Sequence, residues 1–201
     1  ELEGGGDPES LDTFTVSHST GLRVLLAPPS PEMAELVTAT AVRRVLDALR
    51  ARHELVVVDC PPAFNETTLA ILDAADTILA VLTLEITSIK NIRLFLEVAE
   101  QLGYERERLV LVLNRADSTL GIRVSDVEHS IGRRIDHSIV SDGRTVVYAL
   151  NRGVPFVAAS RETQVAQDVI RLARAVAGVP AAATNQPERR PAQKRSLLAW
   201  R

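Results

Sequence analysis

The chain has little cysteine, few aromatic residues and no long apolar run. Its single cysteine, Cys60, excludes an internal disulfide framework and a zinc site built from cysteines. No apolar stretch reaches the roughly 18 residues that a membrane-spanning helix requires, and no signal peptide opens the chain. The four histidines have neither the spacing of a metal site nor that of a catalytic triad. These absences predict a soluble cytoplasmic protein without a cysteine-based or histidine-based metal centre.

The residues that are present suit one α/β domain. A chain of 201 residues, of which 46% are apolar and 24% charged, can bury one sizeable core. Aromatic residues make up only 3%, so that core must consist of small aliphatic side chains. Layers of strands and helices packed through Ala, Val and Leu fit this composition.

The net charge of −3 is unevenly distributed. Residues 178–201 carry five basic residues and one acidic residue, a charge of +4, which leaves −7 for the rest of the chain. Phosphate contacts require a basic surface. The acidic body therefore argues against a protein that binds nucleic acid through its surface.

Residues 55–62 read Leu-Val-Val-Val-Asp-Cys-Pro-Pro. Four apolar residues predict a strand buried on both faces, and the two prolines end it. Ligands of open α/β sheets bind beyond the carboxyl ends of the strands, so Asp59 is a candidate for magnesium or for a phosphate-bound water. An ordinary turn former at a strand end is the alternative. Cys60 reads as a small buried residue, because a catalytic thiol needs a paired histidine.

A second apolar strand, Leu-Val-Leu-Val-Leu over 109–113, ends in Asn114 and Arg115. An asparagine amide both donates and accepts hydrogen bonds, so Asn114 can read the edge of a base, and Arg115 can stack on its face. The alternatives are an Asx turn at Asn114 and a solvated arginine at 115. Ser141 and Asp142 occupy the loop after the next predicted strand.

Strands and helices alternate along the rest of the chain. Alternation of this kind predicts βαβ units that close into a mainly parallel sheet with helices on both faces. Ser30 and Pro31 suit the cap and first turn of the first helix. The expected strands cover 22–27, 55–58, 77–83, 109–114 and 137–140. The expected helices cover 30–52, 66–75, 87–102, 123–131, 144–151 and 162–177.

Together these motifs resemble the MinD/ParA family of deviant P-loop ATPases. The Asp-Cys-Pro-Pro at 59–62 is similar to that family's switch II pattern, and Asn114-Arg115 to its adenine-recognition corner. Residues 149–155 and 19–29 resemble in particular the CpaE/TadZ branch, which serves pilus assembly. The resemblance runs from about Gly21 to Gly178.

The resemblance implies a set of roles. Asp59 would be the catalytic residue and would hold Mg²⁺ through water. Asn114, Arg115, Ser141 and Asp142 would bind the base of ATP. The protein would form a homodimer around two nucleotides and work with components of a pilus or secretion machine, with no specific nucleic acid as partner.

One element of the family is missing. A P-loop cradles phosphates with backbone N–H groups and a lysine, but Gly4-Gly5-Gly6 is followed by Asp7 and Pro8. The chain also begins with Glu1, and its single methionine is Met33. We therefore expect an N-terminally incomplete domain that does not hydrolyse ATP by itself. Because the P-loop strand lies centrally in the family, its absence should leave a gap in the sheet.

Three segments are expected: a flexible leader over 1–18, the ATPase-like domain over 19–178, and a disordered basic tail over 179–201. The last residues, 194–201, interleave basic side chains with Leu197, Leu198 and Trp200. This resembles the amphipathic tails of MinD-like proteins, which bind anionic membranes. A solvated basic terminus is the alternative.

The sequence favours the C-terminal portion of a CpaE/TadZ-like ATPase, cytoplasmic and peripheral at the membrane. ATP binding and hydrolysis would belong to the intact protein alone. A non-catalytic localisation scaffold of the same fold is the first alternative. A MinD-like division-site ATPase or a ParA-like partition ATPase is the second, and the acidic body disfavours the DNA-partition form.

Overall fold

A three-stranded parallel sheet organises the computed structural model, which describes residues 11, 13–117 and 121–178. Its strands are β3 (Ile78–Leu82), β4 (Leu109–Asn114) and β5 (His137–Ile139), in that order. Helix α4 (Ile86–Gln101) connects the first two strands, and α5 (Val124–Ile131) lies between the second and third. These are the predicted βαβ units, and the α/β fold with a parallel sheet is confirmed.

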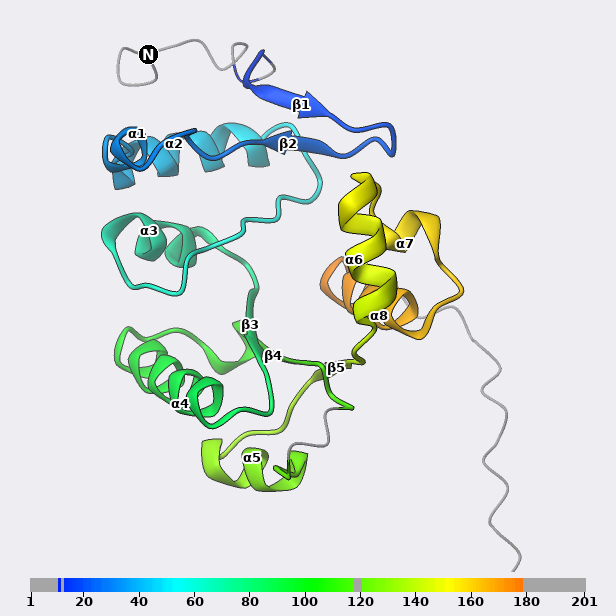
Figure 1. The fold of residues 1–201 in the computed structure, drawn as a ribbon. Coiled ribbons are helices and arrows are strands. Elements are labelled where there is room, and N and C mark those ends of the chain that lie inside the picture. Colours follow the sequence, from blue (N-terminus) through cyan, green and yellow to red (C-terminus); the bar gives the residue numbers. More distant parts are fainter. Residues whose placement is uncertain (1–10, 12, 118–120, 179–201) are drawn as a thin grey trace, which may run out of the picture.

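Helices lie on both sides of this sheet (Figure 1). In that view α3 (Glu66–Ala74) and α4 lie to the left of the parallel strands, and α5 lies below them. Three later helices lie to the right: α6 (Gly143–Arg152), α7 (Phe156–Ala159) and α8 (Gln164–Val176). Helix α7 and the short 3₁₀ turn η3 (Arg106–Arg108) were not predicted from the sequence.

The core lies between the sheet and the helices α3, α4 and α5. Side chains from alternate positions of β3 and β4 point into it, as the two-residue period of a strand requires. Together with α4 and α5 they form the larger of two apolar clusters, whose buried members are Ala80, Leu82, Leu84, Ile92, Leu111, Leu113 and Val127. The second cluster consists of Leu72, Ile78, Ala99 and Leu109, and attaches α3 to the strand starts.

The other face of β3 is open. Parallel strands normally bury both faces, and in β4 Val112 is 1% exposed. In β3, however, Leu79 is 38% and Val81 59% exposed. Within the described residues β3 also pairs with β4 alone, so its second edge has no neighbour. An unpaired edge at β3 is what the expected gap would produce, but the gap itself stays a prediction.

The N-terminal part forms a separate two-stranded sheet. Strand β1 (Thr15–Ser17) runs antiparallel to β2 (Arg23–Leu25), and Gly21 in the connecting turn has a φ of +89° that favours glycine. Of the flexible leader expected over 1–18, residues 15–17 therefore form a strand. The three-residue strand β1 was too short to show an alternating pattern.

The helix expected over 30–52 is two helices, α1 (Pro31–Glu35) and α2 (Ala39–Arg50). Ser30 caps α1 as predicted, its hydroxyl accepting from the backbone N–H of Met33 at 3.4 Å. The hydroxyl of Thr38 accepts from Ala41 N–H at 3.2 Å and starts a new helix. Threonine favours an N-cap over a helix interior, which explains the break.

The strand expected over 55–58 does not form. Within the described residues these positions make no backbone-to-backbone hydrogen bond. Leu55 is 55%, Val57 78% and Val58 40% exposed, whereas a buried strand was predicted. An apolar run can join a sheet only beside a strand whose N–H and C=O groups are free to pair, and the described chain places none there.

Candidate functional site

The loops after β4 and β5 meet at one corner of the sheet. Because Asn114 lies opposite Ile139 in a parallel pair, the carboxyl ends of both strands lie side by side. Beyond the ladder, Ala116 N–H donates to the carbonyl of Ile139 at 2.9 Å. Ser141 N–H donates to Oδ1 of Asp117 at 2.6 Å. The structure thus brings together the two loops that carry Asn114, Arg115, Ser141 and Asp142.

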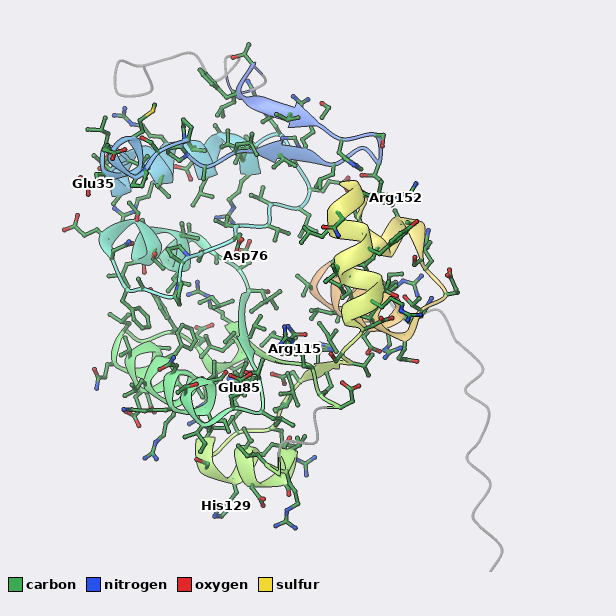
Figure 2. The ribbon with its side chains drawn as sticks, in the orientation of Figure 1. Glu35, Asp76, Glu85, Arg115, His129 and Arg152 are labelled. Atoms are coloured by element: carbon green, nitrogen blue, oxygen red, sulfur yellow. The ribbon has the colours of Figure 1, made fainter. Side chains whose placement is uncertain are left out.

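Arg115 has an unusual backbone. Its φ of +53° is the only positive φ at a non-glycine position in the described chain. A left-handed conformation costs an L-residue roughly 1–2 kcal/mol, and such strain concentrates at functional sites. The Arg115 side chain is exposed beside the sheet (Figure 2).

Asn114 takes part in the same turn. Its Oδ1 accepts from Arg115 N–H at 3.0 Å, a local bond of the kind expected from a turn former. This bond uses one acceptor position of the amide. Within the described part of the chain no other hydrogen bond involves this side chain, so the second lone pair of Oδ1 and both N–H donors of the amide are unused there.

Asp142 is the N-cap of α6. Its Oδ1 accepts from Thr145 N–H at 3.0 Å and its Oδ2 from the Thr145 hydroxyl at 2.6 Å. The side-chain bond and the backbone bond to Thr145 lower the pKa of Asp142 below its usual value. This carboxylate is occupied by the helix, whereas the neighbouring Ser141 is exposed. Asp142 thus has a structural role at the corner, as the cap of α6.

Asp59 lies outside this hydrogen-bonded corner. It is exposed in the extended segment before Pro61, and within the described residues no hydrogen bond or ion pair joins it to the two loops. Burial and the charge of Asp59 raise the pKa of the neighbouring Cys60 thiol, which stays protonated at neutral pH. A raised pKa lowers the fraction of the reactive thiolate at neutral pH.

Two further carboxylates matter at the corner and were missed from the sequence. Asp117 holds Ser141, and the buried Asp168 of α8 accepts from Val140 N–H at 3.0 Å. A sequence signal existed for Asp168, because it lies three positions after Val165 on the apolar face of a helix. A carboxylate on such a face requires a buried partner.

The described part of the corner carries polar side chains but no lysine that could neutralise phosphate charge, since Lys90 lies on α4. Its amide, guanidinium and hydroxyl groups belong to Asn114, Arg115 and Ser141, and its carboxylates, Asp117, Asp142 and Asp168, each accept hydrogen bonds from the protein itself. No group of three or more His, Cys, Asp or Glu side chains among the described residues could hold a metal ion. Any magnesium at Asp59 would therefore need phosphate oxygens and water as its other ligands.

Comparisons with known proteins agree on the fold. A protein-family model described as an AAA domain matches residues 25–110. The septum site-determining protein MinD of Thermotoga maritima is 20% identical over 164 residues, 78% of this chain and 60% of that protein. This chain thus spans less than two thirds of the length of that relative.

Solved structures give the same result at low identity. A ParA family ATPase from Chlorobium tepidum superposes with a TM-score of 0.79 at 20% identity, covering 86% of this chain and 71% of the other. MinD from Pyrococcus horikoshii, complexed with Mg-ADP, gives 0.71 at 18%, covering 87% and 70%. MinD from Aquifex aeolicus, in complex with MinC, gives 0.71 at 19%, covering 91% and 73%.

These matches show the fold of the MinD/ParA ATPases and support that family for this chain. They agree equally well with a MinD-like and with a CpaE/TadZ-like protein. In the part of the chain that the structure describes, no helix is long and apolar enough to span a membrane.

Proposed function

We propose that this chain supplies the base-binding corner and the switch segment of a MinD/ParA-like ATPase that uses ATP and Mg²⁺. The observation that carries the proposal is the corner itself. Two strand-end loops are joined there by hydrogen bonds from Ala116 to Ile139 and from Ser141 to Asp117. They present an asparagine amide and a strained arginine at the edge where α/β sheets bind ligands.

Asn114 suits adenine better than guanine. The free N–H of its amide can donate to a ring nitrogen of adenine, and Oδ1 can accept from the exocyclic amine. Guanine presents a carbonyl oxygen where adenine has that amine, so Oδ1 would meet an acceptor. Arg115 lies next to this amide and can stack its guanidinium on the base.

Asp59 is the proposed catalytic residue. It follows an apolar segment and precedes Pro61 and Pro62, where the resemblance to switch II places a carboxylate near magnesium and the attacking water. Its exposure in the structure leaves the carboxylate free of other partners among the described residues. Mg²⁺, when bound, would supply charge neutralisation of the phosphates. The proposed role of Asp59 is to hold the metal through water and to orient the attacking water.

The phosphates need groups that this chain does not supply. Phosphate loops use a lysine together with backbone N–H groups, and the sequence contains only two lysines, Lys90 and Lys194. Lys90 is exposed on α4, and Lys194 belongs to the tail, outside the described residues. The chain alone should therefore bind ATP weakly and not hydrolyse it.

The proposed cellular role is that of the CpaE/TadZ branch. Residues 19–29 and 149–155 support this branch through their resemblance, and Aquifex MinD, solved with MinC, is a related fold that binds a protein partner. A homodimer that marks a site for a pilus or secretion machine follows from the proposal. A non-catalytic scaffold and a division-site or partition ATPase remain the rival roles.

Membrane association is proposed through residues 194–201, which lie outside the described residues. Each cation near an anionic surface contributes about 1 kcal/mol, and apolar side chains add to this. Sedimentation with liposomes should show binding that grows with anionic lipid and falls with salt. Changing Leu197, Leu198 and Trp200 to serine should abolish it, and binding indifferent to that change would leave a solvated basic terminus.

The base site can be tested without phosphates. Adenosine titrated into the 201-residue chain should shift the amide NMR signals of Asn114, Arg115 and Ser141, and ATP should shift them at similar concentrations. Guanosine should give smaller shifts, because it opposes the Asn114 acceptor. Asn114→Ala should remove the difference between the two nucleosides.

The control is Asn151→Ala, an exposed asparagine on α6 away from the strand ends. It should leave the adenosine response unchanged. Shifts confined to other parts of the molecule, or none at all, would refute the base site. A micromolar dissociation constant for ATP but not for adenosine would instead reveal a phosphate site within this chain.

A further inference from the structure

The turn from β5 to α6 is held from two sides. Asp117 accepts Ser141 N–H from the β4 side, and Asp168 of α8 accepts Val140 N–H at 3.0 Å. We propose that Asp168 is a positioning residue for the base site: it fixes the start of the turn and thereby the place of Ser141 at the corner. The inference rests on the proposed function.

The Asp168 side chain is buried and is held in place by hydrogen bonds. Its side chain is 2% exposed, and its helix neighbours Val165 and Ala166 are buried as well. Oδ1 accepts from Gln164 Nε2 at 2.7 Å and from the guanidinium of Arg171. Those two donors fix the carboxylate on its helix and leave Oδ2 for the backbone of Val140. A buried charge is tolerated only with such a set of donors.

The bond lies at the functional end of β5. The strand pairing ends at Ile139, so Val140 N–H is the first donor beyond the ladder. At the other end, Asp136 makes a comparable bond: its Oδ2 accepts Leu111 N–H at 2.7 Å. Each end of β5 is thus held by an aspartate that accepts a backbone N–H. Only the bond of Asp168 borders the loop that carries Ser141, so the two aspartates form a natural comparison.

Three variants of the whole chain test the role. Asp168→Ala removes the acceptor and should speed amide hydrogen exchange at Val140 by about tenfold relative to the core strand β4, as expected for one lost hydrogen bond. Asp168→Asn keeps one carbonyl oxygen for Val140 and should largely restore protection. Arg171→Ala removes an exposed partner of the carboxylate and should leave Val140 protected.

The second measurement is the adenosine response of Ser141 by NMR, under conditions where every variant is folded. Asp168→Ala should weaken the response and Asp168→Asn should retain most of it. Asp136→Ala is the control for a merely structural role: it removes a strand-end bond of the same kind at the far end of β5. It should lower the free energy of unfolding but leave the Ser141 response at saturating adenosine unchanged.

The outcomes separate the two claims. If the wild-type chain does not respond to adenosine at this corner, the proposed base site is wrong, and the role of Asp168 in it falls too. If the wild type responds and Asp168→Ala responds equally, the positioning role alone is wrong. Equal losses in Asp168→Ala and Asp136→Ala would also overturn it, because general destabilisation would then explain both.

Discussion

The corner after β4 and β5 and the segment 55–62 carry the two halves of the candidate site. They differ in hydrogen bonding and in burial. The corner is joined by hydrogen bonds, anchored by Asp117 and Asp168, and backed by the buried strand β4. The segment makes no backbone-to-backbone pairing outside its own turn among the described residues and exposes Leu55 and Val57. The proposed base half is held by contacts within the described chain, whereas the proposed switch half has no partner strand there.

The two regions differ because only one of them finds its neighbouring strands within the described chain. β4 lies between β3 and β5, so both of its edges find strands within the chain. Residues 55–58 and the free edge of β3 both lack a partner strand within the described residues, and both expose apolar side chains. We propose that the P-loop strand expected from the resemblance to MinD/ParA proteins is the partner that they lack.

The largest contrast is expected from the same truncation in each region. Leu113→Ala, at a position that is 0% exposed in β4, should lower the free energy of unfolding by about 2–5 kcal/mol, because it leaves a cavity in the core. Leu55→Ala, at a position that is 55% exposed, should change it by less than about 0.5 kcal/mol. Urea unfolding followed by circular dichroism measures both.

A large loss of unfolding free energy for Leu55→Ala would contradict the predicted difference between the two regions. It would mean that residue 55 is buried in solution, for instance in a self-associated form that fills the open edge. Repeating the measurement over a range of protein concentrations would identify such a form, because stability would then rise with concentration.

The second prediction separates the two halves by function. In a longer natural protein that carries both this segment and a P-loop, Asp59→Ala should lower the ATP turnover number by about 100-fold or more, since water and magnesium lose an organising carboxylate. Its nucleotide affinity should change little, because the carboxylate does not contact the base. Single-turnover hydrolysis and equilibrium ATP binding are the measurements. A variant with unchanged turnover would remove Asp59 from the mechanism.

The third prediction concerns the base half of the same protein. Asn114→Ala should weaken ATP binding by about tenfold, the effect of losing one or two base hydrogen bonds, and should reduce the preference for ATP over GTP. Turnover at saturating ATP should stay near that of the wild type. Competition between the two nucleotides gives the preference. If it stays unchanged, the side chain of Asn114 is only a turn former.

The sequence predicted well the region packed around β3, β4 and β5, here called the closed region. It predicted the segment 55–62, the open region, poorly. The bounds of α3, α4, α5 and α8 lie within two residues of those expected, because their apolar periodicity is satisfied by neighbours within the chain. Residues 55–58 have the composition of a buried strand, but a strand also needs a partner, and local pattern does not report one. The roles of Asp117 and Asp168 depend on contacts over 24 and 28 positions. The apolar face of α8 indicates that Asp168 has a buried partner, but no local pattern identifies which one.

The fourth prediction tests which region α3 belongs to, since it follows the open segment directly. Tyr104, after α4, donates from its hydroxyl to Asp73 of α3 at 2.8 Å. Burial first, and then this bond and the charge of Asp73, raise the pKa of Tyr104 to about 12. The usual tyrosine pKa is about 10, so the folded state retains the phenol proton that the unfolded state loses.

The resulting stabilisation is full below about pH 10 and is lost as the pH rises toward 12. Tyr104→Phe should lower the free energy of unfolding by about 1 kcal/mol at pH 8, the usual size for one such bond. The difference from wild type should shrink between about pH 10 and 12. A pH-independent difference would mean that the Tyr104–Asp73 bond does not hold α3 to the closed region.

The smallest effect is expected from the strain at the corner. Arg115 is exposed and has a φ of +53°, a conformation that costs roughly 1–2 kcal/mol for an L-residue, whereas glycine loses about 0.5–1 kcal/mol of chain entropy. Arg115→Gly should therefore raise the free energy of unfolding by roughly 0–1 kcal/mol, while it weakens the adenosine response because the stacking group is gone.

Arg134→Gly is the matched control, since Arg134 is exposed without a positive φ, and it should only destabilise. Opposite signs for the two variants, together with a weaker nucleoside response in the first alone, would show that the strain at residue 115 serves the site and not the fold. If Arg115→Gly lowers stability as much as Arg134→Gly does, the left-handed turn is not strained in solution.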